Sequence, residues 1–367
     1  MEKYIDEPIP IRYNRRKERL KTERRKMAMV QKLLSEYRFE PNEDPATAQL
    51  DLVHYGYVCI VDENSRVLYS AGDCDDLVFY RSASKPIQCL PVFVHGLMDA
   101  WGITEEESVI FSASHTGQPC HVRALESILQ KIGVTEDILC MNPTYPTDRA
   151  ANEERIRRGI PLRRVYHNCA GKHAALLMIQ KYLGGEPADY WKTDTPVFRE
   201  TARTIAAMAE TDRMKIGVDG CGVPVFAVGM KNIAISFKNL ACPDRIRSEA
   251  LQRAAAENTA RIARHPEMIR GRGFFCSIMN EDPNIIAKGG ANGVYGFGLK
   301  KQRLGVSFKL VDGTEDAWPF LAMEILRALG ALTPEHEQRL AALHPTFFVN
   351  DNGRVVGQRR SDLTIHI

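Results

Sequence analysis

The sequence contains no run of 18 apolar residues, so we expect no membrane-spanning helix. Residues 1–7 lack the apolar stretch of a secretory signal peptide, and this favours a cytoplasmic location. No internal repeat is present, and no low-complexity segment follows residue 50. With 44% hydrophobic and 26% charged residues, the composition is typical of a globular protein.

Closely spaced cysteine pairs are also missing. The nine cysteines have irregular spacing, and none forms a C-x-x-C pair. This pattern argues against a secreted disulfide scaffold and favours reduced thiols. Any metal site must therefore be assembled from distant positions.

Positive charge is concentrated near the N-terminus. Residues 12–26 hold nine Lys and Arg against two Glu, a local +7, so the net charge of +3 leaves −4 for the remainder. Apolar residues at 20, 27, 30, 33 and 34 predict one helix over residues 15–37, packed on the body or on a second subunit. An anionic surface or nucleic acid is the alternative partner, but no groove-reading motif accompanies the charge, and we expect no nucleic-acid ligand.

Residues 1–48 are thus interpreted as a basic extension and residues 49–367 as one compact α/β domain. A hairpin is expected at 57–61 and 66–69, and a buried helix over 87–98 with a kink at Pro91. A capping box begins a helix at Thr104. Further helices are expected at 121–132, 174–183, 196–208, 228–240, 245–264 and 317–329, with strands at 215–218, 285–287, 294–299, 305–311, 347–349 and 354–356.

The first chemical motif is Ser82-Ala83-Ser84-Lys85. Residues at i and i+3 of a helix share one face. A lysine whose pKa is lowered can take the proton of a serine hydroxyl, as Ser-Lys acyl-transfer enzymes do. Because Ser and Lys are common, the spacing alone is a weak indication of catalysis.

Two further motifs follow in chain order, Ser114-His115-Thr116 and Lys288-Gly289-Gly290. The same order of S-x-x-K, a second serine motif and K-x-G occurs in serine penicillin-recognising enzymes. It predicts two Ser-Lys pairs facing one pocket, Ser82 with Lys85 and Ser114 with Lys288. Two amines in one cleft lower each other's pKa, so that one can be neutral near pH 7.

Two cysteines lie in glycine-containing loops, Cys169 and Cys221, and Lys172 follows Cys169 at the third position. Thiolates bind Zn²⁺ well, whereas lysine is an unusual ligand. From the residues alone, the favoured interpretation of both thiols is that they are core residues. His115 and three further histidines (His121, His167 and His173) are alternative ligands or bases.

Five segments in order carry a family likeness. They are residues 81–86, 113–117, 167–173 (H-N-C-A-G-K-H), 219–224 (D-G-C-G-V-P) and 309–313. Together they resemble the asparaginase II family of Rhizobium etli type, also called class 3 L-asparaginases, from about His54 onward.

This resemblance implies a fold and an activity. The implied fold is an α/β sandwich of sheet and helices like that of serine β-lactamases and penicillin-binding proteins. The implied activity is hydrolysis of L-asparagine to L-aspartate and ammonia through an acyl-enzyme, in a homodimer.

The resemblance also implies residue roles. Ser82 matches the nucleophile and Lys85 its partner, and Ser114 and Lys288 match the second pair. A Zn²⁺ that supports substrate binding matches Cys169, Lys172 and Cys221. Asp219 matches a substrate contact, for which the ammonium is the expected group. Arg81 or His115 is expected at the α-carboxylate, and backbone N–H groups near Ser82 or Gly289 at the oxyanion.

The chain also departs from the family pattern at two positions. Asn292 stands where Glu is usual, and Phe274 where Arg is common. Both changes bear on substrate preference more than on reaction type. The rival interpretations are a β-lactam-recognising or peptidase-like serine acyl transferase, and a non-catalytic protein that binds zinc or an amino acid.

Overall fold

A computed structural model describes residues 30–40 and 47–367. Its main sheet has eight strands in the order β10-β11-β1-β2-β9-β8-β7, with β3 paired to β2. The strands are β1 (Gln31–Arg38), β2 (Gln49–Val61), β3 (Val67–Ala71), β7 (Ile285–Gly290), β8 (Val294–Leu299), β9 (Leu304–Leu310), β10 (Phe347–Val349) and β11 (Val355–Ser361). Every pairing in it is antiparallel.

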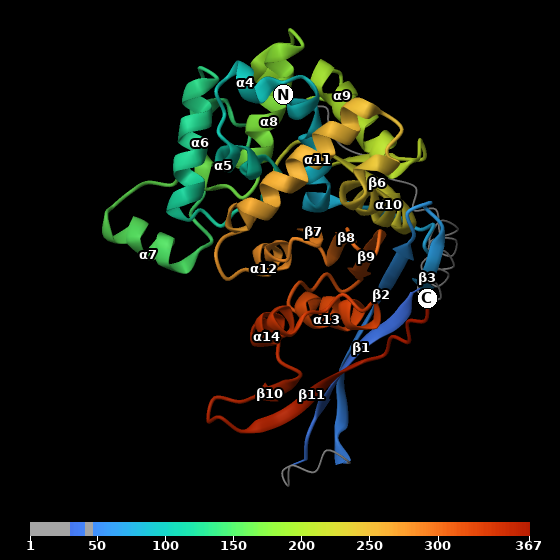
Figure 1. The fold of residues 1–367 in the computed structure, drawn as a ribbon. Coiled ribbons are helices and arrows are strands. Elements are labelled where there is room, and N and C mark those ends of the chain that lie inside the picture. The colour runs from blue at the N-terminus through green and yellow to red at the C-terminus, as the bar shows by residue number, and fades with distance from the viewer. Residues whose placement is uncertain (1–29, 41–46) are drawn as a thin grey trace, which may run out of the picture.

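A second sheet has three strands, β4 (Leu77–Phe79), β6 (Pro224–Gly229) and β5 (Lys215–Val218), in that order. Helices α10 (Met230–Ala241), α12 (Phe275–Glu281), α13 (Trp318–Ala328) and α14 (Pro334–Leu343) accompany the main sheet, whereas α11 (Glu249–Arg264) lies with the helical part above it. The helical part above the sheet in Figure 1 contains α4 (Leu97–Ala100), α5 (Glu105–Val109), α6 (Pro119–Lys131), α7 (Arg149–Arg157), α8 (Ala170–Tyr182) and α9 (Pro196–Ala209). The predicted α/β class is confirmed.

Glycines bring α10 onto the sheet. A Cβ on Gly296 of β8 would lie 2.1 Å from the Phe237 ring, and one on Gly305 of β9 would lie 2.0 Å from Ala234 O. No larger residue fits either position without moving the helix away. Helix α10 thus packs directly on β2, β8 and β9.

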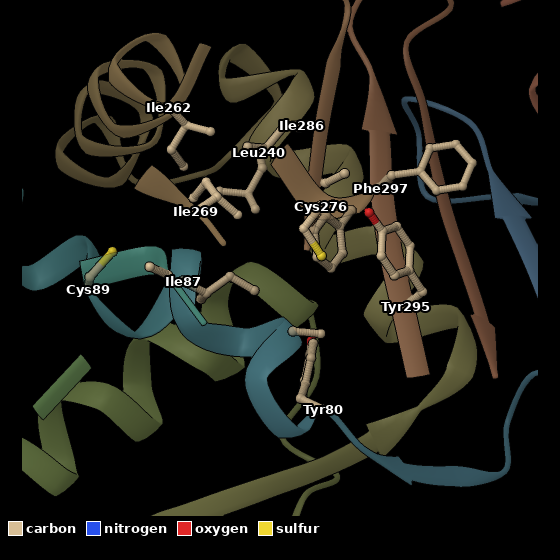
Figure 2. Packing of buried hydrophobic residues seen from close by; sticks show 14 of the residues in the cluster. Tyr80, Ile87, Cys89, Leu240, Ile262, Ile269, Cys276, Ile286, Tyr295 and Phe297 are labelled. Atoms are coloured by element: carbon tan, nitrogen blue, oxygen red, sulfur yellow. The ribbon is translucent and has the colours of Figure 1, made fainter. Parts of the chain in front are cut away.

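The core continues from the sheet to the segment that carries the S-x-x-K motif. Figure 2 shows Tyr80 and Ile87 from that segment in the same cluster as Leu240 of α10, Ile286 of β7 and Tyr295 of β8. All five side chains are at most 1% exposed. The motif is therefore anchored on both sides by packed hydrophobic side chains.

The predicted helix over residues 15–37 is wrong for residues 31–37, which form β1. This strand pairs with both β2 and β11 and buries Leu33 and Leu34. Hydrogen bonds to two neighbouring strands outweigh a local helical periodicity. Residues 15–29 lie outside the described residues.

Most other predicted elements are confirmed, including the capping box at Thr104 and Glu107. The expected helix over 87–98 is three short helices, α2 (Lys85–Gln88), α3 (Leu90–Val94) and α4. Strands β4 and β6 and helices α7, α12 and α14 were not predicted. Within the described part of the chain, no helix combines the length and apolar character needed to cross a membrane.

Candidate active site

Ser82 lies in a 3-10 turn, η2 (Arg81–Ser84), between β4 and α2. Arg81 has φ +50°, in the left-handed region that non-glycine residues rarely occupy. Such a conformation costs on the order of 1–3 kcal/mol, so the surrounding packing must hold the turn in place. The Lys85 N–H donates to Ser82 O, which closes the turn and sets Lys85 one turn after Ser82.

Lys85 is fully buried and its amine is the centre of three hydrogen bonds. Nζ donates to Ala113 O at 2.7 Å, to Ser114 Oγ at 3.1 Å and to Asn168 O at 3.1 Å. Burial lowers the pKa of Lys85 because the charged form loses its hydration. The amine is thereby directed at the second serine motif.

Lys288 of β7 reaches the same hydroxyl from the sheet side. Its Nζ donates to Ser114 Oγ at 2.8 Å and to Gly289 O at 2.6 Å. Burial, the main cause, lowers the pKa of Lys288 to about 7, and the positive charge of Lys85 acts in the same direction. Ser114 is itself 4% exposed and is held by its N–H, which donates to Ile269 O at 2.8 Å.

The structure therefore groups the two predicted pairs differently from the sequence. Ser114 is hydrogen-bonded to both lysines. Ser82 is half-buried, and among the described residues its hydroxyl has no hydrogen-bond partner. Ser82 is thus the more accessible of the two hydroxyls, and Ser114 connects the two amines.

Strand β7 packs against the Ser82 turn through Gly290. A Cβ there would lie 2.3 Å from Tyr80 O and 3.0 Å from Ala83 N, so only glycine permits this approach. Because β7 is the last strand of the sheet, one edge of its backbone faces away from the other strands. This edge lies beside the Ser82 turn.

Asn280 of α12 closes part of that edge, and sequence reasoning did not identify it. Its side-chain amide accepts from Ala287 N–H at 2.9 Å and donates to Ala287 O at 2.9 Å. In an edge strand, the backbone groups that face away from the sheet recur at every second residue. The N–H and C=O of Gly289 therefore point away from the sheet, as those of Ala287 do. The free edge thus begins next to Lys288. No motif in the sequence indicated this clamp.

A second polar cluster contains the cysteine loops. Lys172 Nζ lies 3.1 Å from Cys221 Sγ and 3.5 Å from Asp219 Oδ2. A hydrogen bond from the Cys221 thiol lowers the pKa of Cys169 well below its usual range. Burial lowers the pKa of Lys172, but the neighbouring anions outweigh burial and raise it overall. The pKa of Cys221 is raised by the same hydrogen bond, so the cluster favours a Cys169 thiolate and a Lys172 ammonium.

Asp219 joins the two clusters. Its Oδ1 accepts from Arg81 Nε at 2.9 Å, next to Ser82, and its Oδ2 faces Lys172. His115 is also buried here. Its Nδ1 accepts from the Gly117 N–H at 3.2 Å, and its Nε2 has no partner in the described structure. Burial lowers the pKa of His115 well below its ordinary value, so this side chain is neutral.

The donor types at the cysteine loops fit zinc. In residues 30–40 and 47–367, no three His, Cys, Asp or Glu side chains form a metal-binding group. The predicted set has only two thiols, so its third ligand must be Lys172, which has to lose its proton. Two soft sulfur ligands with a nitrogen suit Zn²⁺ better than an oxygen-preferring cation.

Comparisons with solved structures gave matches of low similarity. A putative β-lactamase from Bacteroides dorei DSM 17855 is 16% identical, with a TM-score of 0.43 over 75% of this chain and 93% of that one. A β-lactamase from Mycobacterium bovis is 13% identical, with a TM-score of 0.38 over 75% and 94% of the two chains. No curated protein sequence matches the chain.

The comparison with protein families is decisive. The family model described as L-asparaginase II matches residues 48–361, which is most of the chain and contains every predicted site residue. The S-x-x-K, H-N-C-A-G-K-H and D-G-C-G-V-P segments all fall within this match. The chain belongs to the L-asparaginase II family.

Proposed function

We propose that the protein hydrolyses L-asparagine to L-aspartate and ammonia, with Ser82 as the nucleophile. One observation carries this proposal. The buried amines of Lys85 and Lys288 both hydrogen-bond to Ser114 Oγ, and the more accessible Ser82 lies in the tight turn beside them. Buried lysines with lowered pKa values are suitable bases for a serine hydroxyl. Family membership supplies the amide substrate.

In the first step, Ser82 Oγ attacks the side-chain amide carbon of asparagine. Lys85, one turn further along, takes the hydroxyl proton when substrate binding tightens the site. The Ser114 hydroxyl passes a proton from the amine pair to the departing nitrogen. The C–N bond breaks, ammonia leaves, and a β-aspartyl ester remains on Ser82.

In the second step, water attacks this ester and the amine pair removes its proton. Aspartate leaves and Ser82 recovers its hydrogen. In both steps the oxygen of the carbonyl becomes negative. The N–H groups of Ser82 and of the β7 edge at Gly289 are the proposed donors to it.

Recognition of the substrate uses the Asp219 region. The carboxylate of Asp219 is the proposed partner of the substrate ammonium. Either Arg81 or His115 is the proposed partner of the substrate α-carboxylate. Zn²⁺ would be held by Cys169, Lys172 and Cys221. When bound, it supplies positive charge next to Asp219 and so supports substrate binding, while the hydrolytic groups remain the serines and lysines.

Assembly and location complete the proposal. We place the protein in the cytoplasm as a homodimer, with asparagine as its small-molecule ligand. The basic segment at residues 12–26 lies outside the described residues, and its packing on the body or on a second subunit stays a prediction.

Ammonia release from L-asparagine tests the activity, with L-glutamine and buffer as controls. Wild type should release ammonia, and Ser82→Ala should lose at least the ~10²-fold expected for removal of an essential nucleophile while unfolding at the same temperature. Folded wild type without release would contradict the proposed reaction. Covalent labelling by a fluorescent penicillin would favour the rival acyl transferase.

A further inference from the structure

A cavity of about 370 Å³ lies beside the Ser82 turn. Its described lining is largely apolar and includes Val30, Leu77, Val78 and Val311. Ammonia is about the size of water, which occupies roughly 30 Å³ in the liquid. The cavity is thus about ten times larger than the leaving group of asparagine requires, and it falls within the size range of small-molecule sites.

The position of the cavity relates it to the nucleophile. Arg81, the residue before Ser82, lines one wall, and Ala291, the residue after Gly290, lines another. Gly290 itself touches the backbone of the Ser82 turn. The cavity is therefore flanked by the two segments between which the reacting carbonyl has to lie.

The charged groups of the cavity favour an anion. Lys309 lines it, and the one described hydrogen-bond partner of its amine is Asn292 O at 2.5 Å; the carboxylate of Asp312, outside the lining, also acts on its charge. The two terminal amino groups of Arg81 have no hydrogen-bond partner among the described residues. The single carboxylate in the lining, Asp76, already accepts from the Tyr57 hydroxyl at 2.7 Å.

Arg81 also separates the cavity from the proposed ammonium site. Its Nε binds Asp219, while the side chain borders the cavity. The acyl part of the substrate lies toward Asp219 in the proposed reaction. The lining includes Arg81 but not Ser82, so the cavity adjoins the nucleophile, and we assign it to the group on the other side of the scissile bond.

From this arrangement we infer that the substrate class includes β-aspartyl amides of apolar amino acids. The apolar side chain of the leaving amino acid occupies the cavity and its carboxylate pairs with Lys309. The inference rests on the proposed function. Ser82 Oγ bonds to the β-carbonyl carbon, the C–N bond breaks, and the amino acid takes up a proton and leaves; water then releases aspartate from the ester.

The test compares three substrates, L-asparagine, β-aspartyl-leucine and β-aspartyl-leucinamide, by release of ammonia, leucine or leucinamide. Wild type should cleave all three. Lys309→Met should lower kcat/KM for β-aspartyl-leucine about tenfold, since it removes one charge partner, and leave asparagine and the leucinamide within about twofold. Lys192→Met, which removes an exposed lysine elsewhere, is the matched control and should change none of the three.

Cavity filling supplies an independent variant. Val311 is 46% exposed at the cavity, so Val311→Phe should fold and should slow both leucine-containing substrates but not asparagine. Cleavage of asparagine without cleavage of β-aspartyl-leucine would overturn the inference and leave the proposed function intact. Loss of both leucine substrates equally in Lys309→Met would overturn the role of Lys309. If wild type cleaves none of the three, the proposed function fails as well.

Discussion

Lys85 and Lys288 share one hydrogen-bond acceptor, the Ser114 hydroxyl oxygen, at 3.1 Å and 2.8 Å respectively. Both amines are fully buried. Burial and the nearby positive charge both disfavour two ammonium groups at this acceptor, and the pKa of each lysine is lowered. The shared hydroxyl is therefore a route by which a proton moves between them.

Ser114→Ala tests this route. Removal of the hydroxyl should lower kcat by about 10²–10⁴-fold, the usual contribution of a proton-transfer group, with a smaller change in KM. Ser307→Ala is the matched control, since Ser307 of β9 is also fully buried but donates to Met230 O, the first residue of α10. Full turnover in folded Ser114→Ala would contradict the relay.

The pH profile tests the state of the amine pair. Below pH 7 Lys288 is protonated, so it can no longer take up a proton through Ser114. Because the pKa of Lys288 is about 7, kcat/KM of wild type should rise with pH through about 7. Lys288→Met should lose this inflection along with most of the activity. An unchanged inflection in the variant would assign it to another group.

Lys288 also makes stability depend on pH. Its pKa falls from 10.5 in the unfolded chain to about 7 in the folded one. Between these values the unfolded chain binds more protons, so the free energy of unfolding should rise as pH increases from 7 toward 10.5. Urea unfolding at pH 7 and pH 9.5 should show a smaller increase in the free energy of unfolding for Lys288→Met than for wild type. An identical increase in both proteins would contradict the lowered pKa.

Asn280 is expected to position Lys288. In Asn280→Ala, the buried N–H and C=O of Ala287 lose their partner, which costs roughly 1–3 kcal/mol per group and loosens β7 one residue before Lys288. Turnover should fall and the inflection near pH 7 should shift. Asn239→Ala removes a comparable buried amide, bonded to Met208 O far from the site, and should lower stability while turnover per folded molecule is kept. If both variants changed turnover per folded molecule equally, Asn280 would have only a structural role.

Zinc is tested by elemental analysis together with kinetics. The purified protein should hold about one Zn²⁺ per chain, and Cys221→Ser should lower this content because it removes one of two sulfur ligands. Loss of the metal should raise KM for asparagine more than it lowers kcat, since the ion is assigned to substrate binding. An unchanged KM in metal-free protein would contradict the proposed role of zinc in substrate binding.

The sequence predicted most helices and strands because their patterns are local. The capping box at Thr104 and the strand at 215–218 depend on adjacent residues, and both occur as expected. Strand β1 shows the limit of such reasoning. Its apolar residues at 30, 33 and 34 fit a helix, and only pairing with β2 and β11, distant in sequence, makes them a strand.

The same limit applies to the site. Motif order identified Ser82, Lys85, Ser114 and Lys288, but the pairing of lysines with serines depends on where the side chains end in space. Both amines meet Ser114, a relationship that spacing along the chain does not contain. The Asn280 clamp depends on a contact between α12 and β7, and it has no short motif.

The covalent intermediate offers the most direct measurement of the central claim. A diazo ketone analogue of asparagine carries an alkylating carbon in place of the amide and traps the attacking nucleophile irreversibly. After digestion and tandem mass spectrometry, the account predicts a single label on Ser82, blocked by excess asparagine and absent in Ser82→Ala. A label on Ser114, with Ser82 unmodified, would contradict the assignment of the nucleophile.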